Sequence, residues 1–207
     1  MAESSKTSYN QNVTETQVIC DSQRLLKSVG QLPDPVVKPT LIVVSGLPGT
    51  GKSYFCRQLV EKLPFVILES DALRKTLFPS PTYTASESSR LFQAIHHLME
   101  GLLKKGIPLI LDATNLSERF REYLYHIADR LNAKLILVRV EAPPEVVYQR
   151  LKARAEDTNL ESNSDADWTV FQKMKPTVQK IQRNHFAVDT SRDITPVLDK
   201  IVREANK

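Results

Sequence analysis

The octapeptide Gly46-Leu47-Pro48-Gly49-Thr50-Gly51-Lys52-Ser53 is the segment from which the fold of this chain can be predicted. It fits Gly-x-x-x-x-Gly-Lys-Ser/Thr, the Walker A pattern of a phosphate-binding loop (P-loop). An apolar, β-branched run at residues 41–44 precedes it, and an amphipathic helix that ends at Pro64 is predicted to follow. A strand, a glycine-rich loop and a helix are the context in which this pattern binds phosphate.

The residue types of the octapeptide account for this chemistry. Gly46, Gly49 and Gly51 allow backbone conformations in which consecutive N–H groups point at phosphate oxygens. Lys52 is expected to reach the β- and γ-phosphates, and the Ser53 hydroxyl is expected to hold Mg²⁺. The alternative is a glycine-rich turn with a solvated lysine. We therefore expect every position of the octapeptide to contribute to binding a nucleoside triphosphate.

The composition is that of an ordinary α/β protein. The 207 residues are 41% hydrophobic and 25% charged, a length that suits one domain with modest appendages. A net charge of +4 permits an anionic substrate without requiring one. Cys20 and Cys56 have no metal-binding spacing, so the reducing cytoplasm is the expected compartment. No apolar run reaches 18 residues, and hence no membrane association is predicted.

Residues 1–39 are predicted to precede the main domain. Residues 1–13 are polar and are expected to be disordered. Thr14 and Gln17 match a capping box for a short helix whose apolar stripe includes Ile19, and a proline-rich linker follows this helix. Two interpretations stay open, a helix packed on the flank of the domain and a partner-binding or regulatory arm.

Residues 40–207 alternate between strand-like and helix-like segments. Strands are predicted at residues 41–44, 65–68, 108–112, 134–140 and 185–188. Helices are predicted after the P-loop, at residues 72–77, from Thr84, from Ser117 (with Phe120 on its buried face), from Pro143, from Ser164 and at residues 196–204. The alternation predicts an α/β P-loop NTPase fold, a parallel five-stranded sheet with helices on both faces. Residues of about 144–183, which include a polar and mobile stretch at 155–163, are expected to form a helical lid.

Two aspartates follow predicted strands. Because ligands bind outside the carboxyl ends of parallel strands, Asp71, Asp112 and Asn115 should share one sheet edge with the P-loop. Asp112 is placed like a Walker B aspartate that helps to hold Mg²⁺, or it makes a turn or cap. Asp71 could take a proton from an acceptor hydroxyl as a general base, or it caps the helix at residues 72–77.

Three arginines complete the set of groups that phosphoryl transfer requires. Arg74 lies one turn after Asp71 and could bind an anionic group of the acceptor, or it is an ordinary surface arginine. Arg150 and Arg154 are four residues apart and hence on one helix face, where they could bind phosphate oxygens. The alternative for this pair is a solvated basic surface.

The octapeptide, residues 69–74 and 111–115, Arg150 and Arg154 together resemble the P-loop kinase group that contains the polynucleotide 5′-kinases. A branch of predicted kinases in that group, often described as AAA-type ATPases, shares these blocks. The resemblance covers residues from 40 to about 205. The same layout is similar to gluconate kinases, antibiotic phosphotransferases and zeta-type toxins.

The resemblance implies roles for individual residues. An aspartate placed like Asp71 is the general base in such 5′-kinases, and an arginine placed like Arg74 contacts the acceptor phosphate. Lid arginines placed like Arg150 and Arg154 clamp the donor phosphates. Asn115 belongs to the block that resembles the Asp-x-Thr-Asn motif of these enzymes and is a candidate for substrate binding.

The sequence therefore predicts a Mg²⁺-dependent kinase that transfers the γ-phosphate of ATP to a hydroxyl group. The favoured acceptor is the 5′-hydroxyl of a polynucleotide, with Tyr83, Phe92 and Trp168 as candidate stacking residues. A sugar, metabolite or antibiotic is the alternative acceptor, because residues 164–168 are more similar to the predicted-kinase branch. A nucleotide-dependent switch or binding module without catalysis is the competing class of function. The choice of ATP over GTP rests on the resemblance.

Overall fold

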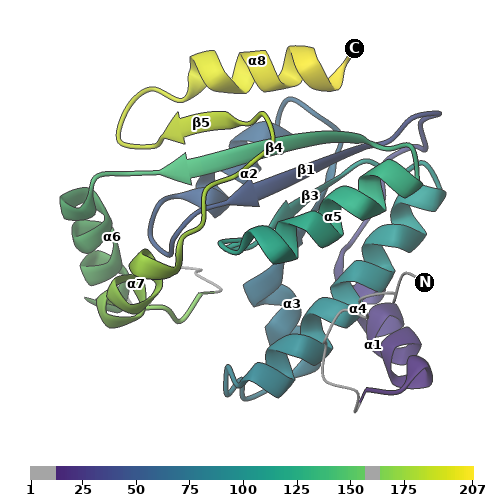
Figure 1. Ribbon diagram of the computed structural model, residues 1–207, viewed down its shortest axis with the longest axis horizontal. Coiled ribbons are helices and arrows are strands. Elements are labelled where there is room, and N and C mark those ends of the chain that lie inside the picture. The colour runs from purple at the N-terminus through teal and green to yellow at the C-terminus, as the bar shows by residue number, and fades with distance from the viewer. Residues whose placement is uncertain (1–12, 157–163) are drawn as a thin grey trace, which may run out of the picture.

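The computed structural model describes residues 13–156 and 164–207, which form an α/β fold around one parallel sheet (Figure 1). In chain order the elements are α1 (Glu15–Ser28), β1 (Thr40–Ser45), α2 (Lys52–Val60), β2 (Val66–Glu69), α3 (Ser70–Leu77), α4 (Ala85–Lys104), β3 (Leu109–Asp112), α5 (Glu118–Arg130), β4 (Lys134–Glu141), α6 (Pro144–Glu156), α7 (Trp168–Met174), the 3₁₀ helix η1 (Lys175–Thr177), β5 (Phe186–Asp189) and α8 (Thr195–Ala205). The five strands lie in the order β2-β3-β1-β4-β5. The predicted fold class is confirmed.

Strand β1 is the centre of the sheet, and all six of its residues are buried. Its register with the neighbouring strands aligns their carboxyl ends, since Val44 of β1 lies opposite Asp112 of β3 and Val138 of β4. Asp112 in turn lies opposite Glu69 of β2. The residues that follow β1, β2 and β3 therefore meet at one edge of the sheet, as expected for a nucleotide-binding α/β fold.

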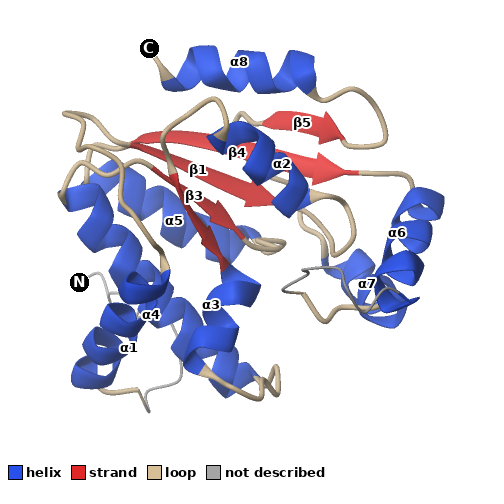
Figure 2. Cartoon of the chain, turned by 180° about the vertical axis from the view of Figure 1, so that it is seen from behind, coloured by secondary structure: helices blue, strands red, loops and turns tan. Residues whose placement is uncertain are grey.

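Helices cover both faces of the sheet. Helices α2 and α8 pack on one face, and α4 and α5 pack on the other together with α1 and α3 (Figures 1 and 2). The side chains of β1 alternate between the two faces of the sheet, which explains this division. Leu41 and Val43 belong to the core cluster of α4 and α5, whereas Ile42 and Val44 pack with α2 and α8. The sheet is thus covered on both sides, and its strands β1 and β3 are buried along their whole length.

Helix α1 packs on the flank of the domain against α4, and the Thr14 side chain caps it by accepting a hydrogen bond from the backbone N–H of Gln17 at 3.2 Å. Its predicted apolar stripe is partly wrong, because Ile19 is 37% exposed whereas Asp21 is fully buried. The reason is an ion pair across the two helices, in which Arg90 Nε of α4 lies 2.6 Å from Asp21 Oδ2. A charge that finds a partner can occupy the buried face of a helix.

Other local predictions need correction. Phe120 of α5 is 54% exposed rather than buried. Helix α7 begins at Trp168 instead of Ser164, because the Asp167 carboxylate accepts the backbone N–H of Val170 at 2.8 Å and so supplies the cap. Residues 1–12 and 157–163, which make up most of the stretches expected to be disordered or mobile, lie outside the described residues.

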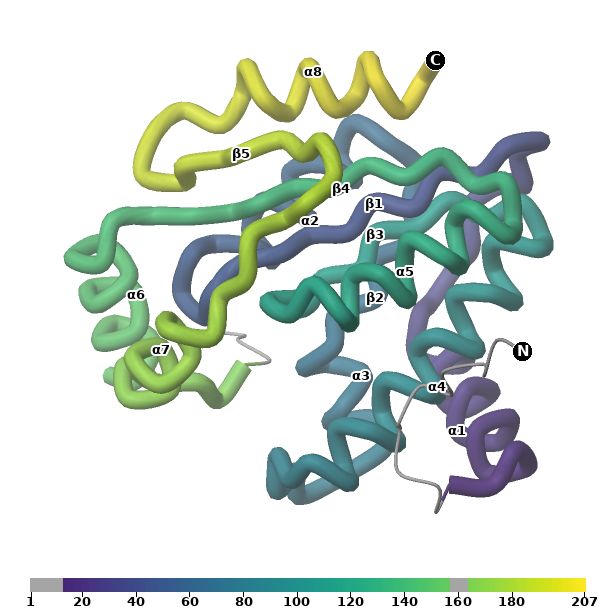
Figure 3. Tube along the Cα trace, viewed as in Figure 1, coloured from purple at the N-terminus to yellow at the C-terminus, as the bar shows by residue number. Residues whose placement is uncertain are grey.

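Helices α6 and α7, called the lid helices below, project beyond the carboxyl edge of the sheet. Figure 3 follows the chain from β4 through both helices and back to β5. Val147, Leu151 and Phe171 form a small apolar cluster between them, and Leu47 of the P-loop packs against this cluster. The lid helices are therefore in direct contact with the phosphate-binding loop. No helix within residues 13–156 and 164–207 has the length and apolar character to cross a membrane.

Candidate active site

A cavity of about 740 Å³ opens at the carboxyl edge of the sheet. The P-loop, α3, the end of β3 and the lid helices form its walls, and side chains from all of them line it. Those predicted from the sequence are Pro48, Gly49, Gly51, Lys52, Ser53, Asp71, Arg74, Asp112, Arg150 and Arg154. The fold thus collects into one cavity residues that are up to about 100 positions apart in the chain. Asn115 is not among the lining residues.

The P-loop has the backbone that its glycines allow. Gly49 and Gly51 have φ angles of 77° and 88°, in the left-handed region, and Gly51 is the N-cap of α2. The first turn of α2 therefore directs its free N–H groups into the cavity, where the helix dipole favours an anion. Lys52 Nζ donates to the backbone carbonyl of Leu47 at 3.1 Å, which folds the ammonium group over the loop.

Ser53 and Asp112 form a pair of oxygen donors on the floor of the cavity. Ser53 Oγ donates a hydrogen bond to Asp112 Oδ2 at 2.6 Å. Burial raises the pKa of Asp112, while the Lys52 charge and the Ser53 hydrogen bond act in the opposite direction. Hard oxygen donors beside a triphosphate site suit Mg²⁺, which is usually held by one or two carboxylates and the substrate phosphates. No cluster of three or more His, Cys, Asp or Glu residues in the described part of the chain forms a separate metal site.

Asp71 lies in the first turn of α3 and faces the same cavity. Among the described residues, no hydrogen bond or ion pair engages its carboxylate. Its negative charge contributes to the raised pKa values of Asp112 and Tyr83. The same charge acts against the burial that lowers the pKa of Arg154. Asp71 thus shares the cavity with Ser53 and Asp112 on one side and Arg154 of the lid on the other. Because α3 begins at Ser70 with Glu69 as its N-cap, Asp71 is not the residue that caps the helix.

Arg74 lines the cavity but is held by other side chains. Its Nη1 lies 2.5 Å from Glu87 Oε1, and both side chains are 7% exposed. The guanidinium also lies 4.8 Å from the ring centroid of Tyr83. Burial raises the pKa of Glu87, but hydrogen bonds from Thr82 and the Arg74 ion pair outweigh this effect and hold the pKa at about 2. The charge of Arg74 is thus largely balanced within the protein.

The lid arginines have different partners. Arg150 donates from both terminal nitrogens to Thr190, to the side-chain hydroxyl and the carbonyl, each at 2.8 Å. Thr190 in turn donates to the carbonyl of Thr50 at 2.6 Å, so α6, the end of β5 and the P-loop are joined through one threonine. Arg154 donates to the carbonyl of Ala166 ahead of α7, and burial lowers its pKa.

Asn115 has a place in the scaffold of the site. Its side-chain amide donates to the carbonyl of Val44 at 2.8 Å, and its own carbonyl accepts a hydrogen bond from Ser45 Oγ at 3.0 Å. The residue adopts a φ of 46°, which asparagine tolerates better than most residues. These bonds fasten the loop after β3 to the end of β1, immediately before the P-loop.

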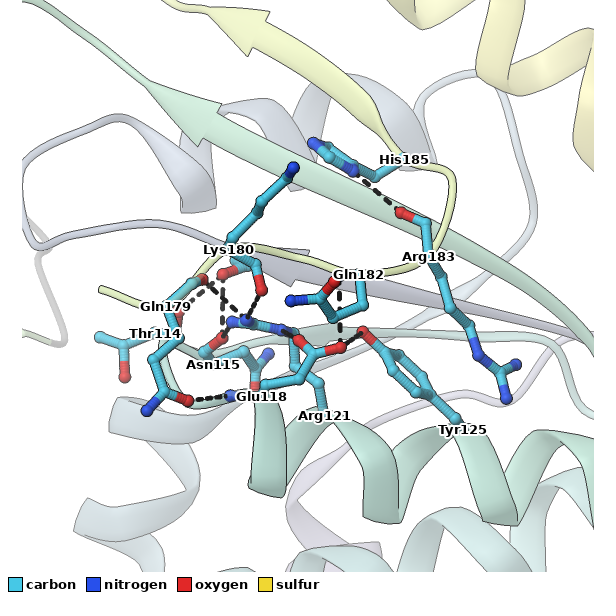
Figure 4. Close-up of polar contacts among 11 residues, drawn as sticks. Thr114, Asn115, Glu118, Arg121, Tyr125, Gln179, Lys180, Gln182, Arg183 and His185 are labelled. Carbon is cyan, nitrogen blue, oxygen red and sulfur yellow. Dashed lines mark hydrogen bonds and ion pairs between the residues drawn. The ribbon is translucent and has the colours of Figure 1, made fainter. Parts of the chain in front are cut away.

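A buried polar network that the sequence did not predict lies beneath this loop (Figure 4). Arg121 of α5 is 1% exposed and donates to the backbone carbonyls of Asn115, Gln179 and Lys180 and to the Glu118 carboxylate. The network ties the loop after β3 to the segment that returns from the lid helices. The sequence signal was limited to a Glu-Arg pair at i, i+3, which is typical of an exposed helix face.

A contact across the cavity was likewise not predicted from the sequence. Tyr83, in the connection between α3 and α4, donates its hydroxyl hydrogen to Asp165 Oδ2 at 2.6 Å. Asp165 precedes α7 and also lies 3.4 Å from the ammonium nitrogen of Lys75. The positive φ of Tyr83, 55°, is uncommon for a bulky residue. Both partners line the cavity, so this contact links its two walls.

Comparisons with known proteins identify the family of this chain. The AAA domain family (AAA_33) matches residues 41–181. The L-seryl-tRNA(Sec) kinase of Methanococcus maripaludis is 25% identical over 115 residues, which are 53% of this chain and 44% of that kinase. The 2′,3′-cyclic-nucleotide 3′-phosphodiesterase of Mus musculus is 26% identical over 144 residues, 68% of this chain and 31% of that protein. The chain spans less than half the length of these curated relatives.

Solved structures share the fold. The APS kinase of Mycobacterium tuberculosis, solved in complex with AMPPNP and APS, superposes with a TM-score of 0.61 at 16% identity, covering 84% of this chain and 100% of that chain. At this identity the likeness concerns the fold alone.

Proposed function

This chain belongs to the AAA domain family of P-loop phosphotransferases, and on that basis we propose that it is an ATP-dependent kinase that transfers the γ-phosphate to a hydroxyl group. One observation carries the proposal. Asp71, a carboxylate without a hydrogen-bonding partner among the described residues, lies in the same cavity as the P-loop and the Ser53–Asp112 pair. A base beside a triphosphate site is what transfer to an acceptor requires.

The donor side of the cavity holds the triphosphate. The loop amides and the N-terminus of α2 bind phosphate oxygens, and Lys52 exchanges its bond to the Leu47 carbonyl for the β- and γ-phosphates. Ser53 and Asp112 are the residues that would hold Mg²⁺, which neutralises phosphate charge when it is bound. ATP in preference to GTP is part of the proposal and rests on the resemblance to the kinase group.

On the acceptor side, Asp71 takes the proton of the attacking hydroxyl. The acceptor oxygen forms a bond to the γ-phosphorus, the bond from this phosphorus to the β–γ bridging oxygen breaks, and ADP leaves with that oxygen. Arg150 and Arg154 lie on the lid side of the same cavity, where they would stabilise charge on the transferred group.

Two acceptors are compatible with this site. The 5′-hydroxyl of a polynucleotide follows from the resemblance, with Arg74 contacting the acceptor phosphate and Tyr83 and Phe92 as aromatic surfaces in the cavity. A small hydroxyl compound is the second candidate, and it is favoured by the ion pair of Arg74 with Glu87, which leaves Arg74 less able to bind a phosphate.

A transfer assay tests the proposal. The purified protein is incubated with γ-labelled ATP, Mg²⁺ and a panel of 5′-hydroxyl oligonucleotides, sugars and aminoglycosides, and labelled products are separated from ATP. We expect label on at least one acceptor. If ATP binds but no acceptor is labelled, and a protein partner instead binds in a nucleotide-dependent manner, the chain is a switch rather than a kinase.

The reducing cytoplasm is the proposed compartment, consistent with the free thiols of Cys20 and Cys56.

A further inference from the structure

The half of the cavity that faces away from the P-loop has a distinct chemical character. Its walls are the acceptor residues Asp71 and Arg74 of α3, Tyr83 from the α3–α4 connection, Phe92 of α4 and Asp165 ahead of α7. We call this set the acceptor pocket. It presents two carboxylates, two aromatic rings and one guanidinium.

The charge balance of the acceptor pocket disfavours an anion. Its cation on the α3 side is Arg74, which is buried against Glu87 at 2.5 Å, while Arg154 of the lid helix α6 lines the same cavity and interacts with the charges of Asp71 and Asp165. The carboxylate of Glu87 is held in turn by the backbone N–H and hydroxyl of Thr82 at 2.7 and 2.8 Å. A phosphate that approached Arg74 would have to compete with this buried carboxylate, and it would also face the charges of Asp71 and Asp165.

The contact between Tyr83 and Asp165 crosses the acceptor pocket at its solvent-facing side, where both side chains are about half exposed. The Tyr83 ring lies over the Arg74 guanidinium at one face, and its hydroxyl bonds to Asp165 across the cavity at 2.6 Å. This bond and the neighbouring pair of Lys75 with Asp165 join α3 and its connection to the start of the lid helix α7. A polymer that left the pocket on this side would have to break both contacts, whereas a compact molecule would not have to pass them.

We propose that the acceptor is a compact polyhydroxyl compound without a phosphate or carboxylate group, either neutral or cationic, such as a sugar, polyol or amino sugar. The inference rests on the proposed kinase function. Asp71 binds the reacting hydroxyl, Asp165 is available to a further hydroxyl or ammonium group, and the faces of Tyr83 and Phe92 suit the C–H face of a sugar ring.

The test compares acceptors that differ by one phosphate. The full chain with Mg²⁺ and γ-labelled ATP is offered glucose and glucose 6-phosphate, glucosamine and glucosamine 6-phosphate, adenosine and adenosine 3′-monophosphate, and a 5′-hydroxyl oligonucleotide. We expect transfer to an unphosphorylated member, with kcat/KM at least tenfold above that of its phosphate ester. Transfer to the oligonucleotide or to the phosphate esters alone would overturn this inference and leave the kinase proposal intact. Transfer to none of the compounds would count against both this inference and the kinase proposal.

Two variants locate the selectivity in the pocket. Tyr83→Phe removes the bond to Asp165 but keeps the ring over Arg74, so we expect KM for the acceptor to rise at least fivefold while KM for ATP is unchanged. Tyr148→Phe, which alters an exposed lid tyrosine in edge-to-face contact with Trp168, is the matched control. Glu87→Gln removes the negative charge that pairs with Arg74. We therefore expect the ratio of kcat/KM between the unphosphorylated acceptor and its phosphate ester to fall. An unchanged preference in Glu87→Gln, and an unchanged acceptor KM in Tyr83→Phe, would each contradict the assignment.

Discussion

The hydroxyl of Ser53 and the carboxylate of Asp112 lie 2.6 Å apart although 59 residues separate them in the chain. The first is the last residue of the P-loop octapeptide and lies in the first turn of α2, and the second ends the adjacent strand β3. Their contact depends on the parallel register of β1 and β3, which brings the ends of both strands to the same level. Several predictions about the site follow from contacts of this kind, because they join elements that fold topology alone brings together.

Asp112→Asn should lower activity without lowering the stability of the fold. Asparagine can still accept the Ser53 hydrogen bond, and it removes a charge whose burial is unfavourable, so we expect a melting temperature equal to or above that of the wild type. Loss of the carboxylate that we propose to hold Mg²⁺ should lower kcat by about 100-fold or more. Calorimetry and a transfer assay check the two parts, and full activity of the variant would show that Asp112 does not hold the metal.

Asp71→Asn tests the general base. The amide has nearly the same shape but cannot take a proton, so ATP affinity should be retained while transfer falls by about two orders of magnitude or more. Asp199→Asn is the matched control, since this half-exposed aspartate of α8 pairs with Lys62 and does not line the cavity. Binding is measured by titration with ATP and transfer with labelled ATP. Near-normal turnover of the Asp71 variant would exclude the proposed role.

Gly49→Ala and Gly101→Ala should have opposite effects on stability. A Cβ at Gly49 would lie 2.9 Å from side-chain carbons of Val147 and Leu151, and its φ of 77° is unfavourable for alanine by about 1–2 kcal/mol. A Cβ at Gly101, inside α4, meets no atom within 4 Å and should raise stability by about 0.5–1 kcal/mol. Thermal unfolding measures both, and we expect weaker ATP binding in the first variant alone.

Arg121→Lys tests the network beneath the loop after β3. Lysine cannot reach the three carbonyls and the Glu118 carboxylate together, and each buried carbonyl left without a donor costs about 1–3 kcal/mol. Arg130→Lys on the same helix, where the side chain is 56% exposed, should change stability by less than about 0.5 kcal/mol. Urea unfolding compares the two variants, and equal midpoints would mean that the network contributes nothing to stability.

The Glu87 carboxylate should make stability depend on acidic pH. Its pKa is about 2 in the folded state, below the ordinary value of 4.5, so the unfolded chain takes up the proton more readily. The stabilising contribution is complete above pH 4.5 and is lost as the pH falls from 4.5 towards 2. In Glu87→Gln this part of the dependence should disappear, which chemical unfolding at a series of pH values can measure. An unchanged slope would contradict the lowered pKa.

Much of this architecture could be predicted from local patterns. The octapeptide, the β-branched run before it and the alternation of strands and helices predicted the parallel sheet, because each signal lies within a short segment. The rule for carboxyl ends of parallel strands also placed Asp71 and Asp112 at the P-loop edge, where both line the cavity. Topology thus predicted a relation that spacing in the sequence does not contain.

Side-chain partners could not be predicted in the same way. Asp21 is buried because Arg90 reaches it from another helix, and Arg121 is buried because two separate segments offer their carbonyls. Neither partner is near in sequence, so a hydropathy pattern treats both residues as exposed. The pairing of Arg74 with Glu87 likewise depends on how α3 and α4 meet, and it changes the acceptor chemistry that the isolated arginine suggests.

The place of β1 at the centre of the sheet has a consequence for biosynthesis. This strand is the first to leave the ribosome, yet both of its neighbours, β3 and β4, come much later in the chain. Until residue 109 is available, the buried strand has no partner, and closing such distant contacts is slow. The growing polypeptide therefore carries an unpaired apolar strand while residues 46–108 are made, and this strand is where chaperone binding or aggregation should begin.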